Sequence, residues 1–231
     1  ILMPTGELQL FGCTDGAGNV LRTGNVPAPG TAQKEDNLLN VLTVGAGGEY
    51  ATINAALAAI TDNGEDNRYV VKVGPGVYTE RIVMKPYVGL VGSGIDTTTV
   101  QDTATAIPDS ILVLASHSAV RGLSLTQARG ALMGYAVRAD ATADCTLEQV
   151  SVTVTGDAAV TGVRVTSGGL VCRDVQVRVP DDHTCYSFLT QSSGEDSPVS
   201  LRLFHCLTAG RYALYVNTDW CSIEMSNCDF G

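Results

Sequence analysis

The chain has 231 residues, of which 45% are hydrophobic and 16% charged, and its formal net charge is −10. This is enough apolar material for one large core or one stack of repeats, so a second globular domain is not required. The negative charge, with no Lys/Arg cluster to reverse it locally, argues against nucleic acid as a partner, and the short apolar runs argue against membrane insertion.

The first 40 residues differ from the rest because Gly, Pro, Asn and Thr dominate them. The Pro-rich segment at residues 25–30 is incompatible with a regular element. We therefore expect an extended arm at residues 1–40, in which residues 7–11 and 19–22 could pair as a small hairpin. Such a piece cannot bury its apolar face alone, so the arm is expected to anchor the chain to a partner surface.

The chain then contains one expected helix between expected strands. A strand at residues 42–45 is followed by Thr52, a suitable N-cap, and by apolar side chains at helical spacing up to Ile60. Asn63-Gly64 is the expected end of this helix. Residues 68–73 and 77–83 are predicted strands on either side of a Gly-Pro-Gly turn.

From about residue 88 onward the sequence repeats one pattern: an apolar residue, two variable positions, an apolar residue, one variable position, and an apolar residue or Thr. Its copies begin at Val120, Leu147, Cys172, Leu203 and Met225, so the spacing varies between 22 and 31 residues. A second short strand precedes each copy, at residues 111–114, 135–139, 162–165, 186–188 and 212–216. The longest spacing contains residues 191–198, a predicted surface loop.

Two short alternating strands per repeat predict the coils of a solenoid, in which the five starting residues form one vertical file. The fold class is therefore all-β, a right-handed parallel β-helix at residues 41–231, with one N-terminal capping α-helix and the extended arm. Because the pattern is still strand-like at Gly231, we expect the β-helix to be C-terminally incomplete, with a further segment or a partner chain covering its end.

The seven cysteines form no CxxC pair and no zinc pattern with His, so neither a metal nor a cofactor is expected. Several take apolar positions of the repeat, as Cys172 and Cys206 do. We expect them to be reduced thiols that pack as small hydrophobic side chains.

Four features follow one another in residues 42–101: Val44-Gly45, Tyr50-Ala51-Thr52-Ile53, Gly76-Val77-Tyr78-Thr79-Glu80 and Val91-Gly92-Ser93-Gly94. In this order they resemble the N-terminal part of pectin methylesterases and related proteins of the pectin-lyase-like superfamily. The resemblance covers about a quarter of the chain and implies the β-helix fold. Bacteriophage tail spikes and tail fibres open in a similar way.

The resemblance does not extend to the catalytic residues of the esterases, which are two Asp, a Gln that stabilises the oxyanion and an Arg. Gln101-Asp102-Thr103 lies too early in the chain and lacks the Leu that follows in the family motif. Asp229-Phe230-Gly231 matches only a fragment of another motif. Neither segment is assigned a catalytic role, so the chain is interpreted as non-catalytic.

Asp181 and Asp182, beside His183, are the remaining candidates for acid–base chemistry on a glycan. They follow Pro180 between two strands, and a solvated turn has the same composition, so the turn is favoured. Arg138 and Arg164 take matching places on successive coils without a convergent set of carboxylates for calcium. Their expected partners are surface Asp or Glu side chains.

Three aromatic residues near the end of the chain, Tyr212, Tyr215 and Trp220, are predicted to form one exposed patch. Such a patch could stack on a sugar or on a neighbouring chain. It is the candidate site for contact with a glycan or a partner.

The leading functional hypothesis is a structural β-helix of a virion: a bacteriophage tail fibre, tail spike or similar surface appendage involved in host attachment. We expect a homotrimer at the virion surface or otherwise extracellular, with other virion proteins contacting residues 1–40 and a host surface glycan as a further partner. The assignment to a phage rests on resemblance. The alternatives are a carbohydrate-active enzyme, pectinesterase-like or a polysaccharide depolymerase, and a bacterial surface adhesin that binds glycans without cutting them.

Overall fold

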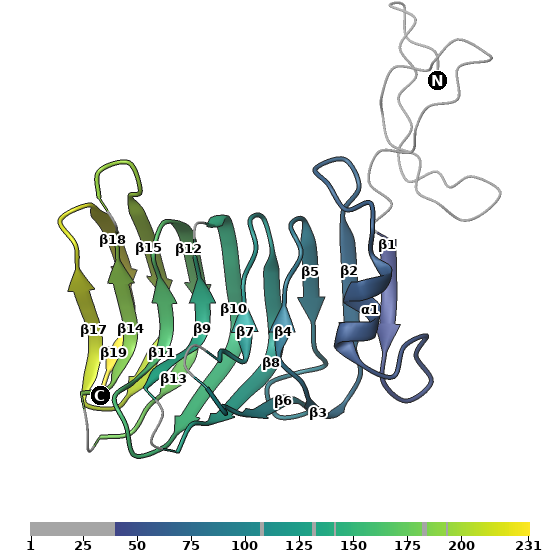
Figure 1. The fold of residues 1–231 in the computed structure, drawn as a ribbon, viewed down its shortest axis with the longest axis horizontal. Coiled ribbons are helices and arrows are strands. Elements are labelled where there is room, and N and C mark those ends of the chain that lie inside the picture. Colours follow the sequence, from purple (N-terminus) through teal and green to yellow (C-terminus); the bar gives the residue numbers. More distant parts are fainter. Residues whose placement is uncertain (1–39, 107–108, 131–132, 141, 182–183, 193) are drawn as a thin grey trace, which may run out of the picture. The chain divides into compact units, whose positions relative to one another are not determined.

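The computed structural model describes residues 40–106, 109–130, 133–140, 142–181, 184–192 and 194–231. Apart from Asn40, the predicted arm and its hairpin lie outside these residues. The described residues form a right-handed parallel β-helix of about 7 turns, whose coils follow one another along a single axis (Figure 1). They contain no helix with the length and hydrophobicity to cross a bilayer.

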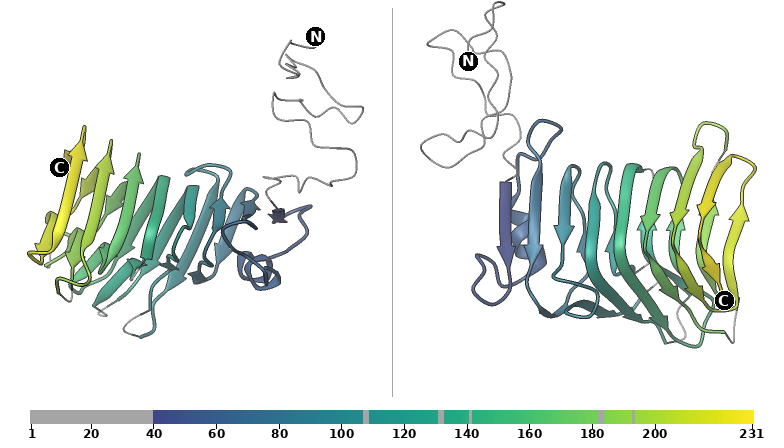
Figure 2. Two further views of the ribbon diagram at one scale, coloured as in Figure 1. Left: turned by 90° about the horizontal axis from the view of Figure 1, so that it is seen from above. Right: turned by 180° about the vertical axis from the view of Figure 1, so that it is seen from behind.

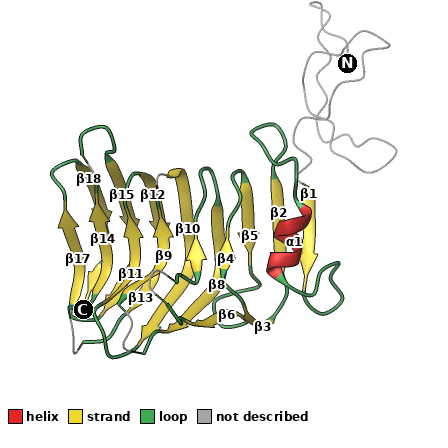
Figure 3. Cartoon of the chain, viewed as in Figure 1, coloured by secondary structure: helices red, strands yellow, loops and turns green. Residues whose placement is uncertain are grey.

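The strands of the β-helix form two sheets, and every pairing within them is parallel (Figure 3). The larger sheet runs in the order β1 (Asn40–Val44), β2 (Tyr69–Val73), β5 (Val88–Val91), β8 (Ala119–Ala128), β10 (Thr142–Thr155), β12 (Gly168–Arg173), β15 (Val199–Phe204) and β18 (Cys221–Ser226). It continues around a corner into β3 (Gly76–Thr79), β6 (Thr98–Thr103), β13 (Gln176–Arg178), β16 (Leu207–Ala209) and β19 (Asp229–Phe230). The second sheet has the order β4 (Ile82–Val83), β7 (Leu112–Val113), β9 (Gly134–Ala139), β11 (Val160–Val165), β14 (Tyr186–Gln191) and β17 (Tyr212–Asn217). Figure 2 shows the two sheets from above and from behind.

The predicted vertical file is confirmed by the strand register. Leu147 lies opposite Val120 on one side and Cys172 on the other, Cys172 lies opposite Leu203, and Leu203 lies opposite Met225. The first four side chains are buried, whereas Met225 is 49% exposed on the last described coil. Burial of each such side chain contributes about 1.5–3 kcal/mol, so the file is a main source of stability.

A sharp corner inside each repeat explains the two variable positions of the pattern. The second of them has a positive φ in every copy: Gly122 (65°), Gln149 (52°), Asp174 (53°), His205 (53°) and Asn227 (52°). Gly, Asn, Asp and His adopt this left-handed conformation more readily than other residues, and β-branched residues avoid it. The corner thus selects the residue type while the flanking apolar positions face the core.

The cysteines that the structure describes are free thiols, of which Cys145, Cys172, Cys185 and Cys206 are buried. Cys206 shows how such a thiol packs at the corner. It follows His205 and places its Sγ 3.5 Å from the Phe204 carbonyl and 3.7 Å from the Cys172 carbonyl of the preceding coil. Burial raises the pKa of Cys206 to about 11, so the group stays a neutral thiol.

The predicted helix is present as α1 (Ile53–Ala59), but the prediction of its end is wrong. Thr52 is the N-cap and accepts a hydrogen bond from the Ala55 amide at 3.2 Å. The helix ends before Ile60, whose backbone is extended and whose side chain is buried in the core, instead of at Asn63-Gly64. Tertiary packing of Ile60 therefore overrides the local end signal.

The strand predicted at residues 77–83 is divided by a corner into β3 and β4. Glu80 lies at this corner and accepts hydrogen bonds from the amides of Ile53 and Asn54, both at 2.9 Å. These amides belong to the first turn of α1, where a carboxylate is favourable. The corner therefore holds the helix on the first coils.

Candidate functional site

The outer face of the second sheet carries charged and aromatic side chains at matching positions. Arg138 of β9 lies opposite Arg164 of β11, as the repeat predicted. The same row continues through Leu189 of β14 to Tyr215 of β17. Because the coils stack in register, these residues, which are far apart in the sequence, form one row across the second sheet.

A hollow of about 490 Å³ opens where these strands end. Its lining comes from the ends of β9, β11 and β14 and from the predicted surface loop, of which Ser192 and Ser197 form one wall. The lining residues are Arg138, Asp140, Arg164, Thr166, Ser167, Gln191, Ser192 and Ser197.

Both guanidinium groups of the hollow contact the same carboxylate. Arg138 donates from Nε to Asp140 Oδ2 at 2.7 Å, and Arg164 Nη1 lies 3.7 Å from Asp140 Oδ1. Arg164 Nη2 also donates to Gln191 Oε1 at 3.3 Å, and its guanidinium lies 4.4 Å from the centre of the Tyr135 ring. Two cations and one anion line the hollow, so its described wall is locally positive in a protein of net charge −10.

Three tyrosines form an aromatic surface on the neighbouring strands β14 and β17. The ring of Tyr186 stacks on Tyr215 at 4.7 Å and lies 5.5 Å from Tyr212. Tyr215 and Tyr212 are 41% and 43% exposed. Burial, with the nearby Tyr215 and Tyr212, raises the pKa of Tyr186, so its hydroxyl stays protonated at neutral pH. The rings offer a flat apolar surface edged by hydrogen-bonding groups.

Trp220 lines a hollow to which neither Tyr212 nor Tyr215 contributes. This hollow has a volume of about 500 Å³ and is lined by Gly168, Pro198, Val199, Ser200, Asp219, Trp220, Cys221 and Ser222. Trp220 is 46% exposed, and within the described part of the chain no ring contact joins it to Tyr212 or Tyr215. The single patch expected from the sequence stays a prediction.

Of the two carboxylate candidates of the sequence, the structure describes Asp181. Asp181 is exposed in a bend that follows β13, and Asp182 and His183 lie outside the described residues. No three His, Cys, Asp or Glu side chains in the described ranges converge on a point that could hold a metal ion.

A partly buried polar cluster, missed in the sequence, contains the residue types of an esterase centre. Arg81 pairs with Asp102 at 2.7 Å and with Asp109 at 2.8 Å, and Arg129 donates to Gln127 Oε1 at 2.8 Å. Gln127 and Arg129 have almost no exposed surface. The Thr105 amide, with further hydrogen bonds and Arg81, lowers the pKa of Asp109. These side chains pair with one another, so the cluster stabilises the part of the coils in which it lies.

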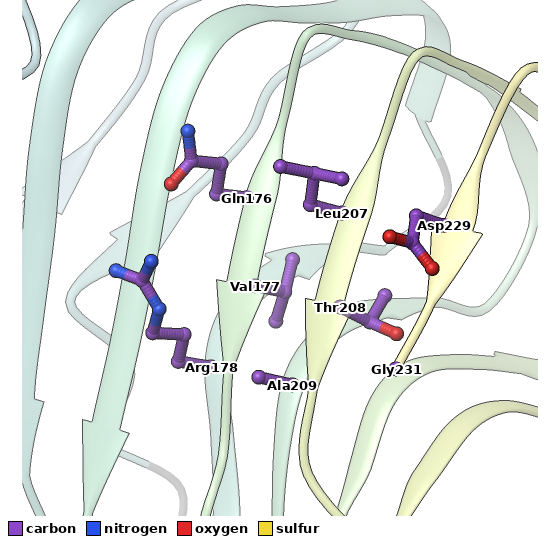
Figure 4. Close-up of a pocket in the computed structure, with 8 residues that line it drawn as sticks. All are labelled: Gln176, Val177, Arg178, Leu207, Thr208, Ala209, Asp229 and Gly231. Atoms are coloured by element: carbon purple, nitrogen blue, oxygen red, sulfur yellow. The ribbon is translucent and has the colours of Figure 1, made fainter.

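A smaller hollow of about 210 Å³ lies between β13, β16 and β19. Figure 4 shows Gln176 and Arg178 on one side of it and Asp229 on the other, with Leu207 between them. Its lining holds one guanidinium and one carboxylate, so it lacks the excess positive charge of the hollow at Arg138.

No family model matches the sequence, and no curated protein matches it. Among solved structures, the chain is similar to the pectin methylesterase from Aspergillus niger, with 13% identity, 83% of this chain and 86% of that chain covered, and a TM-score of 0.52. The pectin methylesterase PemA from Erwinia chrysanthemi is 11% identical over 84% of this chain and 90% of that chain, with a TM-score of 0.39. Escherichia coli YbhC is 12% identical over 94% and 77%, with a TM-score of 0.44. At 13% identity the likeness to the Aspergillus niger structure shows the fold alone, a right-handed parallel β-helix.

Proposed function

We propose that this chain is a non-catalytic β-helix that binds an acidic glycan through the hollow at Arg138 and Arg164 and the tyrosines beside it. The observation that carries the proposal is a locally positive hollow next to exposed aromatic rings in an acidic protein. Guanidinium groups bind carboxylates through paired hydrogen bonds, and tyrosine rings stack on the apolar faces of sugars. Together they fit a glycan that carries carboxylates.

The contacts of Asp140 with Arg138 and Arg164 support binding of a glycan without its cleavage. Glycosidic hydrolysis uses two carboxyl groups on either side of the scissile bond. Asp140 is the sole carboxylate among the described residues that line the hollow, and both guanidiniums engage it. Its oxygens accept hydrogen bonds from Arg138 and Thr166 and lie near Arg164, so Asp140 is engaged as an acceptor instead of acting as a base.

We also propose a setting: an appendage on the surface of a virion, such as a bacteriophage tail fibre or tail spike, that attaches the particle to a host glycan. In this setting the chain is a homotrimer, and residues 1–40 contact other virion proteins. What supports it is the stacking of coils, which builds an extended outer face without a closed cleft. A bacterial surface adhesin that binds glycans would use the same face, and only the setting would differ.

The second candidate is a carbohydrate-active enzyme of the pectinesterase kind. The fold similarity to the pectin methylesterase from Aspergillus niger and the residue types of the cluster around Arg81 favour it. An esterase of this kind would release methanol from methylated pectin, and a depolymerase would release reducing ends.

The two candidates separate in one set of measurements on the full chain. We expect an array of acidic and neutral glycans to show binding of acidic ones, weakened about tenfold in Arg164→Gln, because a charge-assisted pair contributes about 1.5–3 kcal/mol. Arg121→Gln is the matched control, because Arg121 pairs with Glu148 on the larger sheet, outside the hollow. Binding of no acidic glycan would overturn the proposal, and release of methanol or reducing ends would establish the enzyme. Light scattering tests the trimer, which a monomer would contradict.

A further inference from the structure

Three hollows follow one another around the edge where the second sheet passes into the larger one. In Figure 1 the loops that connect β14 to β15 and β17 to β18 lie along this edge. The hollow at Arg164 shares Ser167 and Ser197 with a hollow of about 430 Å³, which in turn shares Gly168 and Pro198 with the hollow at Trp220. Neighbouring hollows therefore adjoin one another along this edge, and we refer to the three adjoining hollows together as the groove.

The floor of this groove is held by backbone contacts. The Gly168 amide donates to the Pro198 carbonyl at 2.8 Å, which ties the start of β12 to the start of β15. Gly168 has a φ of +79°, and a Cβ there would lie 1.6 Å from the Thr142 carbonyl oxygen. A side chain at this position would displace the floor, so glycine keeps the groove in shape.

The far end of the groove has the chemistry of a sugar-binding site. The backbone at Trp220 is fixed, because its amide donates to Thr218 Oγ1 at 3.1 Å and its carbonyl accepts from the Val199 amide at 3.0 Å. The half-exposed indole has Asp219 and serine hydroxyls around it. An aromatic face stacks on the C–H groups of a pyranose, while a carboxylate and hydroxyls accept and donate hydrogen bonds to its hydroxyls.

Charge differs between the two ends of the groove. The end at Arg138 and Arg164 has an excess of positive charge, whereas Asp196 lines the middle and Asp219 lines the Trp220 end. A carboxylate is attracted at the first end and repelled beyond it. A glycan that carries a carboxylate on every unit would therefore not fit the whole groove.

We propose that the hollow at Trp220 is a second subsite, which takes an uncharged pyranose of the same glycan whose acidic unit is held by Arg138 and Arg164. The ligand class is an oligosaccharide that contains both acidic and neutral sugars. This inference rests on the proposed function and deepens it. Ser197 and Pro198 lie between the two ends, since Ser197 lines the hollow at Arg164 and Pro198 lines the hollow at Trp220.

The test uses the full chain and three defined hexasaccharides: one of hyaluronan, in which acidic and neutral sugars alternate, one of galacturonic acid, and neutral cellohexaose. Trp220 is the single tryptophan of the sequence, so its fluorescence reports this subsite directly. We expect the hyaluronan hexasaccharide to shift the Trp220 emission and the galacturonic acid hexasaccharide to bind without such a shift. Calorimetry should show roughly tenfold weaker binding of the hyaluronan hexasaccharide to Trp220→Ala, and little change with Trp220→Phe, which keeps an aromatic face.

The outcomes separate this inference from the function on which it rests. If the acidic hexasaccharides bind and Arg164→Gln weakens them, but Trp220 emission and the Trp220→Ala affinity stay unchanged, the second subsite is refuted and the proposed function stands. If the galacturonic acid hexasaccharide shifts the emission as much as that of hyaluronan, the preference for a mixed glycan is refuted. If no acidic hexasaccharide binds, both proposals fail.

Discussion

Asp140→Asn should increase the affinity of the chain for an acidic glycan. Asp140 contacts Arg138 at 2.7 Å and Arg164 at 3.7 Å, and all three side chains are about a quarter exposed. A partly exposed pair of this kind contributes no more than about 1 kcal/mol, so the arginines lose little order without it. Removal of the negative charge ends its repulsion of a bound carboxylate, which is about 1 kcal/mol for two unit charges about 4 Å apart in a water-like dielectric, or roughly fivefold in Kd.

Titration calorimetry with the galacturonic acid hexasaccharide measures this gain at low ionic strength, and about 1 M salt should remove most of it by screening. Asp174→Asn is the matched control, since it makes the same change of charge at an exposed corner where asparagine also accepts the positive φ. Unchanged or weaker binding by Asp140→Asn would refute the idea that the Asp140 charge repels the bound carboxylate. An equal gain in Asp174→Asn would attribute the effect to net charge alone.

Three further predictions concern the scaffold. Leu147→Ala, in the middle of the buried file, should cost about 2–5 kcal/mol in chemical unfolding, whereas Met225→Ala at its exposed end should cost about 1 kcal/mol or less; equal losses would contradict the file. The Asp109 carboxyl has a folded-state pKa below its ordinary 3.8, so its contribution to the stability of the fold is complete above pH 3.8 and is lost as the pH falls through the lower value. Asp109→Asn should therefore unfold at a lower urea concentration at neutral pH. Its urea midpoint should also fall less on acidification than that of the unaltered chain. Gly168→Ala should lower the melting temperature by several degrees, because its Cβ meets a carbonyl oxygen of the preceding coil, while Gly64→Ala, with nothing within 4 Å, should not; similar melting temperatures would contradict the close approach.

The coils could be predicted from the sequence because each repeat specifies its own geometry. Alternating apolar residues fix which side chains face inward. The left-handed corner lies at the residue just before the second apolar position of each repeat, as at Gln149, Asp174 and His205. The end of the helix could not be predicted, since Ile60 leaves the helix to pack against coils that are distant in sequence. Local sequence signals fail to predict the structure where a contact between coils determines the backbone conformation.

The candidate site was predictable only in part. Equivalent positions in the repeat placed Arg138 beside Arg164, but Asp140 and Gln191 come from strand ends whose approach depends on loops of irregular length. Trp220 lies in the turn between β17 and β18, and the sequence alone does not show that it lines a hollow with the starts of β12 and β15. The cluster around Arg81 had one sequence signal, a polar Gln127 at a position where alternation requires an inward apolar residue.

The register of the rungs does not depend on the length of the connections between them. Cys172 and Leu203 stack although 31 residues separate them, and Leu203 and Met225 stack although 22 do. The segment between β14 and β15 can therefore be lengthened, shortened or exchanged while the strands on both sides keep their partners. New recognition properties can arise there by loop replacement alone, and the same position is suited to grafting a foreign binding loop onto an unaltered scaffold.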